Sequence, residues 1–408
     1  MEMNKSQRVY KTIMLIILTA MITFLVTVIA MYNKFESTTV ADTNNGQTTT
    51  VTESSLTKVL NEFKTILKQK YIGDIDEEDM IEGAIKGYIE GLGDPYTEYL
   101  TKEEMAELME ETSSKYVGIG VYVANNTKDD TILVAGVMKG SPALEAGMQA
   151  GDIIEKVDGT EYRGSELTKA TAALKGEEGT SVKVIVLRDG EEIEMEITRR
   201  TINVEHVDST VLEDNIGYIQ IDSFDDGVAE AFEKELEELQ EQNIKGLIID
   251  LRSNGGGVVD EATDIADLFT EKGKTVLITK DKNGKEDITK AKKDKMVKDI
   301  PVIVLVNQGT ASASEILAGA LKDNYGAKIV GKNTYGKGVI QTVYSLTDGS
   351  GLKITTEEYY TPNHTAINKV GIKPDVEVEL TKDSEGNYET SIEKDAQLLK
   401  AIETVTNL

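Results

Sequence analysis

The stretch VIVLVNQGTASASEILAGALKD, residues 302–323, determines the fold class. Its first five residues are all apolar, which is typical of a strand buried on both faces, and a helix is predicted to begin near Ser312. Similar elements alternate along the second half of the chain, which predicts an α/β domain with a largely parallel sheet and helices on its faces. We expect strands at 215–221, 245–251, 274–279, 327–331, 338–346 and 350–360, and helices at 229–243, 260–269 and 396–405.

Ser312 lacks the usual partners of a nucleophilic serine. The chain has two histidines, His206 and His364, and no cysteine. Lys337 follows in the glycine-flanked turn TYGKG, and a buried neutral lysine is the base of the Ser-Lys variants of the catalytic triad. The pair therefore indicates hydrolysis of acyl bonds. Two alternatives stay open locally: Ser312 is equally an ordinary helix N-cap, and a lysine in such a turn is usually solvated or bound to phosphate.

A second junction between a strand and a helix, IIDLRSNGGGVVDEA at 248–262, contains the run Gly255-Gly256-Gly257. Glycines at such a junction let backbone N–H groups point into a site, which is how an oxyanion hole is built. A triple glycine alone is more often only a permissive loop.

Residues from about 116 to 201 form a different pattern of short strands and two helices. Ser141 and Pro142 predict the start of one helix, and Ser165 is expected to cap the other, which Gly176 ends. In their order, YVGIG, SPALEAGMQAGDIIEKVDG and the later helix resemble a PDZ domain.

The PDZ resemblance implies a binding site for the C-terminal end of a peptide. The backbone of the 117–120 loop, with Gly118, Ile119 and Gly120, would bind the terminal carboxylate. The peptide would then pair along the strand that continues through Val121, with a side-chain pocket at Leu174.

The N-terminal residues indicate location. Residues 12–33 are 22 uncharged residues preceded by Lys5, Arg8 and Lys11, and as a helix they would span about 33 Å. A cleaved signal peptide is the competing interpretation, but no small-x-small site follows the run. We expect a cytoplasmic N-terminus at 1–11, a transmembrane anchor at 12–33, a flexible linker at 34–53 and an extracytoplasmic remainder.

The composition limits the classes of binding partner that we expect. The formal net charge is −28, so a nucleic-acid partner is not expected, and membrane contact is expected only through the N-terminal helix. The lysine-rich stretch at 280–299 is predicted to be a solvated excursion. The absence of cysteine excludes disulfides and zinc-thiolate sites, and no metal or cofactor is expected.

Six motifs together resemble the C-terminal processing peptidases, the tail-specific proteases of peptidase family S41. They are DPYTEYL, the inserted PDZ domain, DLRSNGGG, NQGTASASEILAGALKD, GKNTYGKGVIQ and TPNHTAINKVGIKPD, and they extend from about 55 to 380. The resemblance implies a helical region at 54–112, a PDZ domain at 113–201, a peptidase core at 202–380 related to the ClpP and crotonase folds, and a C-terminal helical segment at 381–408.

The same resemblance implies roles for individual residues. Ser312 would be the nucleophile, Lys337 the general base and Gln341 the residue that orients it. The oxyanion donors would be the N–H of Ala313 and one of Gly256 and Gly257, and Asp323 would be structural. Thr310 replaces a family serine, and His364 stands where relatives usually have glycine.

The leading hypothesis is a membrane-anchored homodimeric serine endopeptidase, whose PDZ domain recognises apolar C-terminal tails of protein substrates and gates activity. An inactive PDZ scaffold on a peptidase fold is the alternative. A crotonase-like acyl-CoA enzyme is third, because no motif supports it.

Overall fold

The computed structural model describes residues 53–297, 300–380 and 394–408 and divides the chain into two compact units, Met1–Glu77 and Glu78–Leu408. The predicted segments at 1–11 and 12–33, and nearly all of the linker at 34–53, lie outside the described residues. Among the helices that are described, none combines the length and apolarity needed to cross a bilayer.

The apolar spacing between 54 and 112 predicts helices, and three form there: α2 (Glu53–Lys70), α3 (Glu77–Glu90) and α4 (Lys102–Thr112). Thr101 caps α4 in a capping box with Glu104, whose carboxylate accepts from the Thr101 N–H at 2.8 Å. A short strand that the sequence did not predict, β1 (Glu98–Leu100), lies between α3 and α4.

The second region has its own core and the predicted hairpins. Asp158-Gly159 and Asp189-Gly190 all have positive φ, as two-residue hairpin turns require. The main sheet has the order β3-β4-β5-β7-β8, so β3 is an edge strand, and β2 pairs with β9. The elements are β2 (Lys115–Gly118), β3 (Val121–Asn126), β4 (Thr131–Val137), α5 (Pro142–Glu145), β5 (Ile153–Val157), β6 (Thr160–Glu161), α6 (Leu167–Leu174), β7 (Ser181–Arg188), β8 (Glu191–Thr198) and β9 (Arg200–Asn203).

One cap in this region was predicted wrongly. Ser141 caps α5 as expected, but Ser165 lies inside a 3₁₀ turn, Gly164–Glu166, that precedes α6. The Ser165 N–H donates to Asp130 at 2.7 Å instead of the serine capping the helix. This contact between distant segments overrides the local capping preference.

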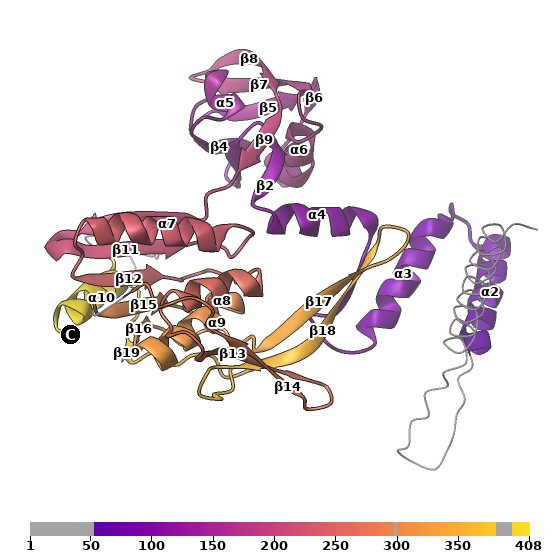
Figure 1. Ribbon diagram of the computed structural model, residues 1–408. Coiled ribbons are helices and arrows are strands. Elements are labelled where there is room, and N and C mark those ends of the chain that lie inside the picture. The colour runs from indigo at the N-terminus through magenta and orange to yellow at the C-terminus, as the bar shows by residue number, and fades with distance from the viewer. Residues whose placement is uncertain (1–52, 298–299, 381–393) are drawn as a thin grey trace, which may run out of the picture. The chain divides into compact units, whose positions relative to one another are not determined.

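The expected parallel sheet forms the centre of the third region. Its order is β10-β11-β12-β15-β16-β19, and only the first pair is antiparallel. Helices α7, α8 and α9 share one apolar cluster with the sheet, whereas α10 packs in a second cluster on the opposite face (Figure 1). The bounds are β10 (Val207–Leu212), β11 (Ile216–Ile221), α7 (Val228–Glu241), β12 (Gly246–Asp250), α8 (Val259–Asp267), β15 (Val302–Val306), α9 (Ala313–Ala320), β16 (Lys328–Gly331), β19 (Val376–Glu377) and α10 (Ala396–Thr406).

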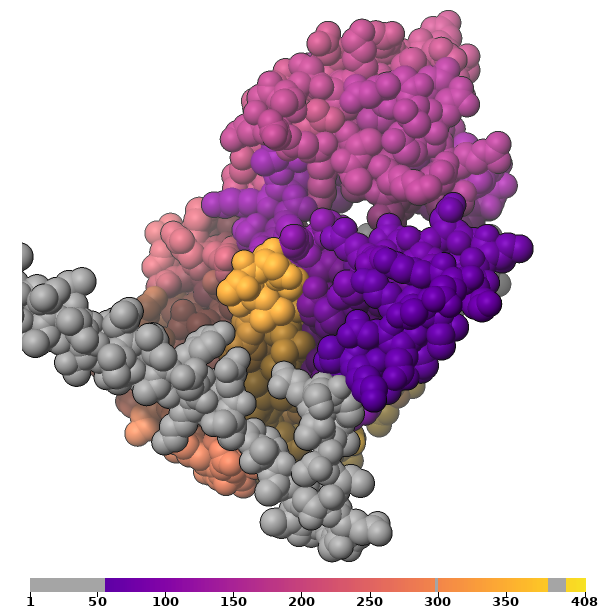
Figure 2. All heavy atoms as spheres, turned by 90° about the vertical axis from the view of Figure 1, so that its right-hand side faces the viewer, coloured from indigo at the N-terminus to yellow at the C-terminus, as the bar shows by residue number. Residues whose placement is uncertain are grey.

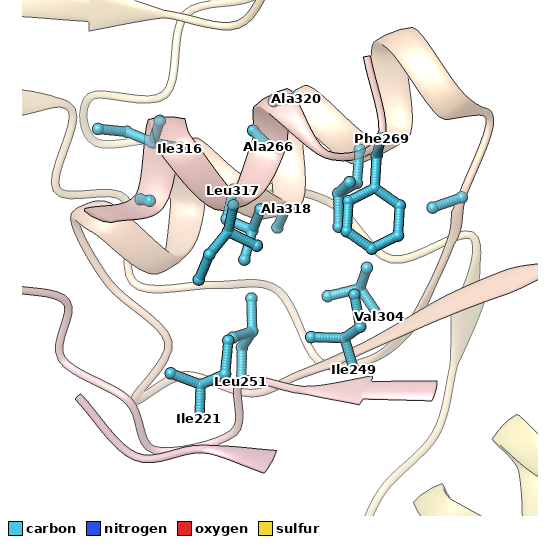
Figure 3. Close-up of a cluster of buried hydrophobic side chains, with 14 of the residues drawn as sticks. Ile221, Ile249, Leu251, Ala266, Phe269, Val304, Ile316, Leu317, Ala318 and Ala320 are labelled. Atoms are coloured by element: carbon cyan, nitrogen blue, oxygen red, sulfur yellow. The ribbon is translucent and has the colours of Figure 1, made fainter. Parts of the chain in front are cut away.

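Helix α9 is positioned by this core. Leu317 points toward Ile221 of β11 and Leu251, the residue after β12, and Phe269 lies at the far end of the same cluster (Figure 3). All eight residues of α9 are buried. The residue that precedes α9 is therefore held against a rigid support, which is a property that a reactive site needs.

A second, antiparallel sheet was only partly predicted. Strand β18 pairs with β1, β13 and β17, and β13 also pairs with β14. The strands are β13 (Thr275–Asp281), β14 (Glu286–Lys290), β17 (Val339–Ser345) and β18 (Gly351–Tyr360). The stretch predicted to be a solvated excursion, 280–299, contains the unpredicted strand β14, whose backbone pairs with β13 while its side chains remain largely exposed. The tip of the β17–β18 hairpin is the orange patch in Figure 2.

Candidate active site

Ser312 stands between the end of β15 and the first residue of α9. Its φ of 57° and ψ of −120° differ from the extended conformation of an ordinary N-cap. A non-glycine residue in such a conformation costs about 1–3 kcal/mol, and such residues cluster at functional sites. Its backbone thus argues against the interpretation of Ser312 as a simple cap.

The triple glycine lies directly against Ser312. A Cβ on Gly256 would stand 2.7 Å from the Ser312 Cβ, so only glycine permits this approach. The Gly256 N–H donates to Asn254 Oδ1 at 2.8 Å. Within the part of the chain that the structure describes, the N–H groups of Gly257 and Ala313 have no such acceptor. Of the expected oxyanion donors, Gly256 is therefore engaged, and Gly257 and Ala313 are available.

A buried carboxylate joins the Ser312 and Lys337 segments. Glu315 is fully buried, and its Oε2 accepts from the Ser312 N–H at 3.0 Å and from the Lys337 N–H at 2.9 Å. Its Oε1 accepts from the Gly336 N–H at 2.8 Å and from the Thr334 hydroxyl. Burial raises the pKa of Glu315, and these hydrogen bonds oppose that rise.

The sequence analysis missed Glu315. The available signal was its position three residues after a helix-starting serine, the spacing of a capping box. A second link was also missed: the Tyr359 hydroxyl contacts the carbonyls of both Ser312, at 3.0 Å, and Lys337.

Lys337 is half-buried, and its Nζ lies 4.8 Å from the centroid of the Tyr96 ring. Burial lowers the pKa of Lys337, and the positive charge of Lys353 lowers it further. The carboxylates of Asp94, Glu315 and Glu98 act in the opposite direction. A lowered pKa increases the neutral fraction of the amine, which is the form that can accept a proton.

Gln341 lies near Lys337 but donates elsewhere. Its Nε2 donates to Thr355 Oγ1 at 3.1 Å, and a bulge between Ile340 and Gln341 interrupts the alternation of β17. In the described residues, no hydrogen bond joins the Lys337 amine to Ser312 or Gln341.

Ser312, Lys337 and Gln341 nevertheless line one cavity of about 490 Å³. Much of the remaining wall is apolar and comes from α4, the loop before α8 and β17. The other lining residues are Leu108, Met109, Thr112, Gly255, Gly257, Val258, Val259, Asp260, Val339, Ile340, Val343 and Lys353. The cavity has the polar groups for nucleophilic chemistry and space for an apolar chain. Among the described residues, no group of His, Asp or Glu is arranged to hold a metal ion.

Four other residues singled out from the sequence lie outside this cavity. Buried Thr310 donates to the Leu251 carbonyl at 2.7 Å, and Asp323 accepts from the Asn363 N–H at 2.9 Å. His364 is exposed in a turn. His206, which had no predicted partner, pairs with Asp225 at 2.9 Å.

The predicted peptide-binding residues gather beside the free edge of β3. Gly118 ends β2, Ile119 is buried, and Gly120 has a φ of 78° immediately before Val121 begins β3. Leu174, at the end of α6, is buried in the core of the same domain.

Comparisons with known proteins agree with this architecture. A model of peptidase family S41 matches residues 215–378, a PDZ model matches 133–188, and a model of the activating protease CtpB N-terminal domain matches 16–104. The chain is 39% identical over 336 residues to the carboxy-terminal processing protease CtpA of Bacillus subtilis, covering 82% of this chain and 72% of the relative.

A probable CtpA-like serine protease of Staphylococcus aureus is 37% identical over 386 residues, covering 93% of this chain and 76% of the relative. A solved putative S41 protease from Bacteroides fragilis has a TM-score of 0.52 at 17% identity, covering 83% of this chain and 93% of that one, and it shows a shared fold. The extent of these similarities and the agreement of the domain matches lead to one assignment: this chain is a serine peptidase that belongs to the carboxy-terminal processing proteases of peptidase family S41.

Proposed function

We propose that this peptidase cleaves peptide bonds with a Ser312–Lys337 dyad. The neutral Lys337 amine takes the proton of the Ser312 hydroxyl as its oxygen attacks the scissile carbonyl. The resulting ammonium then gives that proton to the leaving amine, and water hydrolyses the acyl-serine by the same route in reverse.

The observation that carries this proposal is the Glu315 carboxylate, which binds the backbone N–H groups of both residues. The N–H groups of Ala313 and Gly257 are the proposed oxyanion donors. Gln341 is proposed to orient the amine when substrate is bound, because catalytic hydrogen bonds often tighten only in that complex.

We further propose that the PDZ domain binds apolar C-terminal tails and gates the cavity. The free edge of β3 beside α6 supports addition of a peptide strand. Helix α4 supports coupling, because its Glu110 pairs with Lys175 next to α6 while its Leu108 and Met109 line the cavity of Ser312. A peptide bound at α6 would therefore act on a wall of the cavity.

Anchoring and assembly complete the proposal. The segment at 12–33 is proposed to be a single transmembrane helix that keeps the catalytic part extracytoplasmic. Helix α2 presents the exposed apolar side chains of Leu56, Phe63 and Ile66, which supports a homodimer contact through this helix. The domain boundaries proposed are 54–112, 113–201, 202–380 and 381–408.

Tail dependence tests the function directly. The full chain is incubated with an unstructured protein that ends in apolar residues, and with the same protein ending in charged residues, with Ser312→Ala as the inactive control. We expect cleavage by the wild type only, at least about tenfold faster for the apolar tail, since tenfold corresponds to 1.4 kcal/mol of tail recognition.

A free apolar peptide, added to the reaction with the charged-tail protein, tests whether tail binding opens the cavity or only brings the substrate to it. Stimulated cleavage supports the gate, and unchanged cleavage contradicts it. Binding of the apolar tail without cleavage by either form, even with added peptide, would favour the inactive scaffold.

Glu315→Gln is expected to reduce turnover by about 100-fold and to destabilise the fold by about 1–3 kcal/mol. Glutamine retains one acceptor oxygen. Its NH₂ group would face backbone N–H groups that now donate hydrogen bonds to the carboxylate, so two donors would oppose each other. The reaction rate and thermal unfolding of this variant should be compared with Glu241→Gln, at an exposed glutamate at the end of α7. Wild-type turnover in Glu315→Gln would show that the carboxylate does not position the dyad.

A further inference from the structure

The DPYTEYL segment, 94–100, is built into the sheet that carries Lys337. Glu98 is paired with Lys353 across β1 and β18, and their side chains form an ion pair at 2.9 Å. Thr97 Oγ1 accepts from the Thr355 N–H at 3.0 Å and donates to Asp94 at 2.6 Å. The segment is thus fixed by both backbone and side-chain contacts.

These contacts fix Tyr96 against the amine of Lys337. Its ring centroid lies 4.8 Å from Nζ, within the range of a cation–π interaction. The Tyr96 N–H donates to Asp94 Oδ1 at 3.2 Å, and Asp94 in turn accepts from Thr97. The backbone that carries the ring is therefore held in place beside Lys337.

The carboxylates around Lys337 are already committed to other groups. Asp94 accepts from Thr97 and from the Tyr96 N–H, Glu98 pairs with Lys353, and Glu315 accepts from four donors. A free carboxylate in contact with a buried lysine would hold its proton and remove the base. The partly negative face of an aromatic ring stabilises the cation more weakly, by a factor of roughly 2 to 30 in the protonation equilibrium.

We propose that Tyr96 is a positioning residue for proton transfer, whose ring face holds the ammonium that Lys337 becomes when it takes the Ser312 proton. The proton then leaves Lys337 for the amine of the departing peptide, and the neutral base is regenerated. The ring would stabilise the protonated base, as the aspartate carboxylate does in a Ser-His-Asp triad. This inference rests on the proposed dyad and adds a third member to it.

The test measures covalent labelling of Ser312 by a small aryl sulfonyl fluoride as a function of pH, using the full chain. This readout requires neither a tail nor the PDZ domain. The labelling rate of the wild type should rise with pH as Lys337 loses its proton. This rising limb of the pH–rate profile should be absent in Lys337→Ala. Because the ring favours the protonated amine, Tyr96→Leu should move this limb down by about 0.4–1.5 pH units and lower its plateau several-fold.

Three comparisons isolate the ring face. Tyr96→Phe should keep the limb within about 0.3 pH units, since it retains the ring and loses only the hydroxyl. Pentafluorophenylalanine at 96 keeps the shape and reverses the polarity of the face, so it should shift the limb as leucine does. Tyr99→Leu, in β1 and lining a different cavity, is the control with a wild-type limb.

Three outcomes would overturn the proposal. The first is an unmoved limb in Tyr96→Leu or, if that variant unfolds, in the pentafluorophenylalanine variant. The second is an equal shift in Tyr96→Phe, which would assign the effect to the hydroxyl. The third is a wild-type profile without a Lys337-dependent limb, which would remove the dyad and this inference together.

Discussion

Ser312→Ala is expected to lower hydrolysis of an unstructured protein by about 10⁴–10⁶-fold, because no other described side chain of the cavity combines a hydroxyl with a strained helix-start position. Removing one oxygen leaves the Cβ, the backbone contacts to Glu315 and the buried helix behind it unchanged. The melting temperature should therefore remain within a few degrees of the wild type. Initial rates at several substrate concentrations give kcat/KM for the comparison.

Ser314→Ala is the matched control. Its hydroxyl donates to the Asn254 carbonyl at 3.0 Å in the buried interior, so its loss should cost about 1 kcal/mol of stability and less than tenfold in rate. Substantial turnover in Ser312→Ala, or a larger loss in Ser314→Ala, would remove Ser312 from the role of nucleophile.

Lys337→Ala is expected to lose at least about 10⁴-fold in kcat, and Lys337→Arg should not restore it. Arginine retains its proton at all accessible pH values, so it cannot accept one from Ser312. In the wild type, burial and the charge of Lys353 lower the pKa of Lys337. The neutral fraction, and with it the rate, should rise with pH through a limb below the ordinary lysine value of about 10.4.

Lys353→Met tests whether the charge of Lys353 lowers the pKa of Lys337. Removing this positive charge weakens one of the two effects that lower the pKa of Lys337, so the limb should move to higher pH. A wild-type rate that is flat from acid to strongly alkaline pH would contradict a neutral-lysine base, and an unchanged limb in Lys353→Met would show that Lys353 does not tune it.

The parts that could be predicted from sequence are those that local patterns specify. Val302–Val306 and the helix after Ser312 were predicted because a strand buried on both faces is an unbroken apolar run. The Ser312–Lys337 pair followed from the scarcity of alternative nucleophiles and bases, and both line one cavity.

The remaining features depend on contacts between residues that are far apart in the chain. Tyr96 was only part of a motif, because nothing near it in sequence indicates that Lys337 lies against its ring. Strand β14 was missed because its side chains are largely exposed and it gains order from pairing with β13. In the sequence alone, Glu315 has only the spacing of a helix-capping residue. Its contact with the Lys337 turn becomes visible only in the fold.

The pairing of β1 with β18 has a consequence for synthesis. Glu98 and Lys353 are 255 positions apart, and ribosomes need roughly ten seconds to a minute to add that length at 5–20 residues per second. A nascent chain that has emerged only as far as Ser312 lacks both the lysine and the strand against which Tyr96 is held. With Lys337 as the proposed base, we expect the chain to remain inactive during synthesis and to gain activity only after the β17–β18 hairpin pairs with β1.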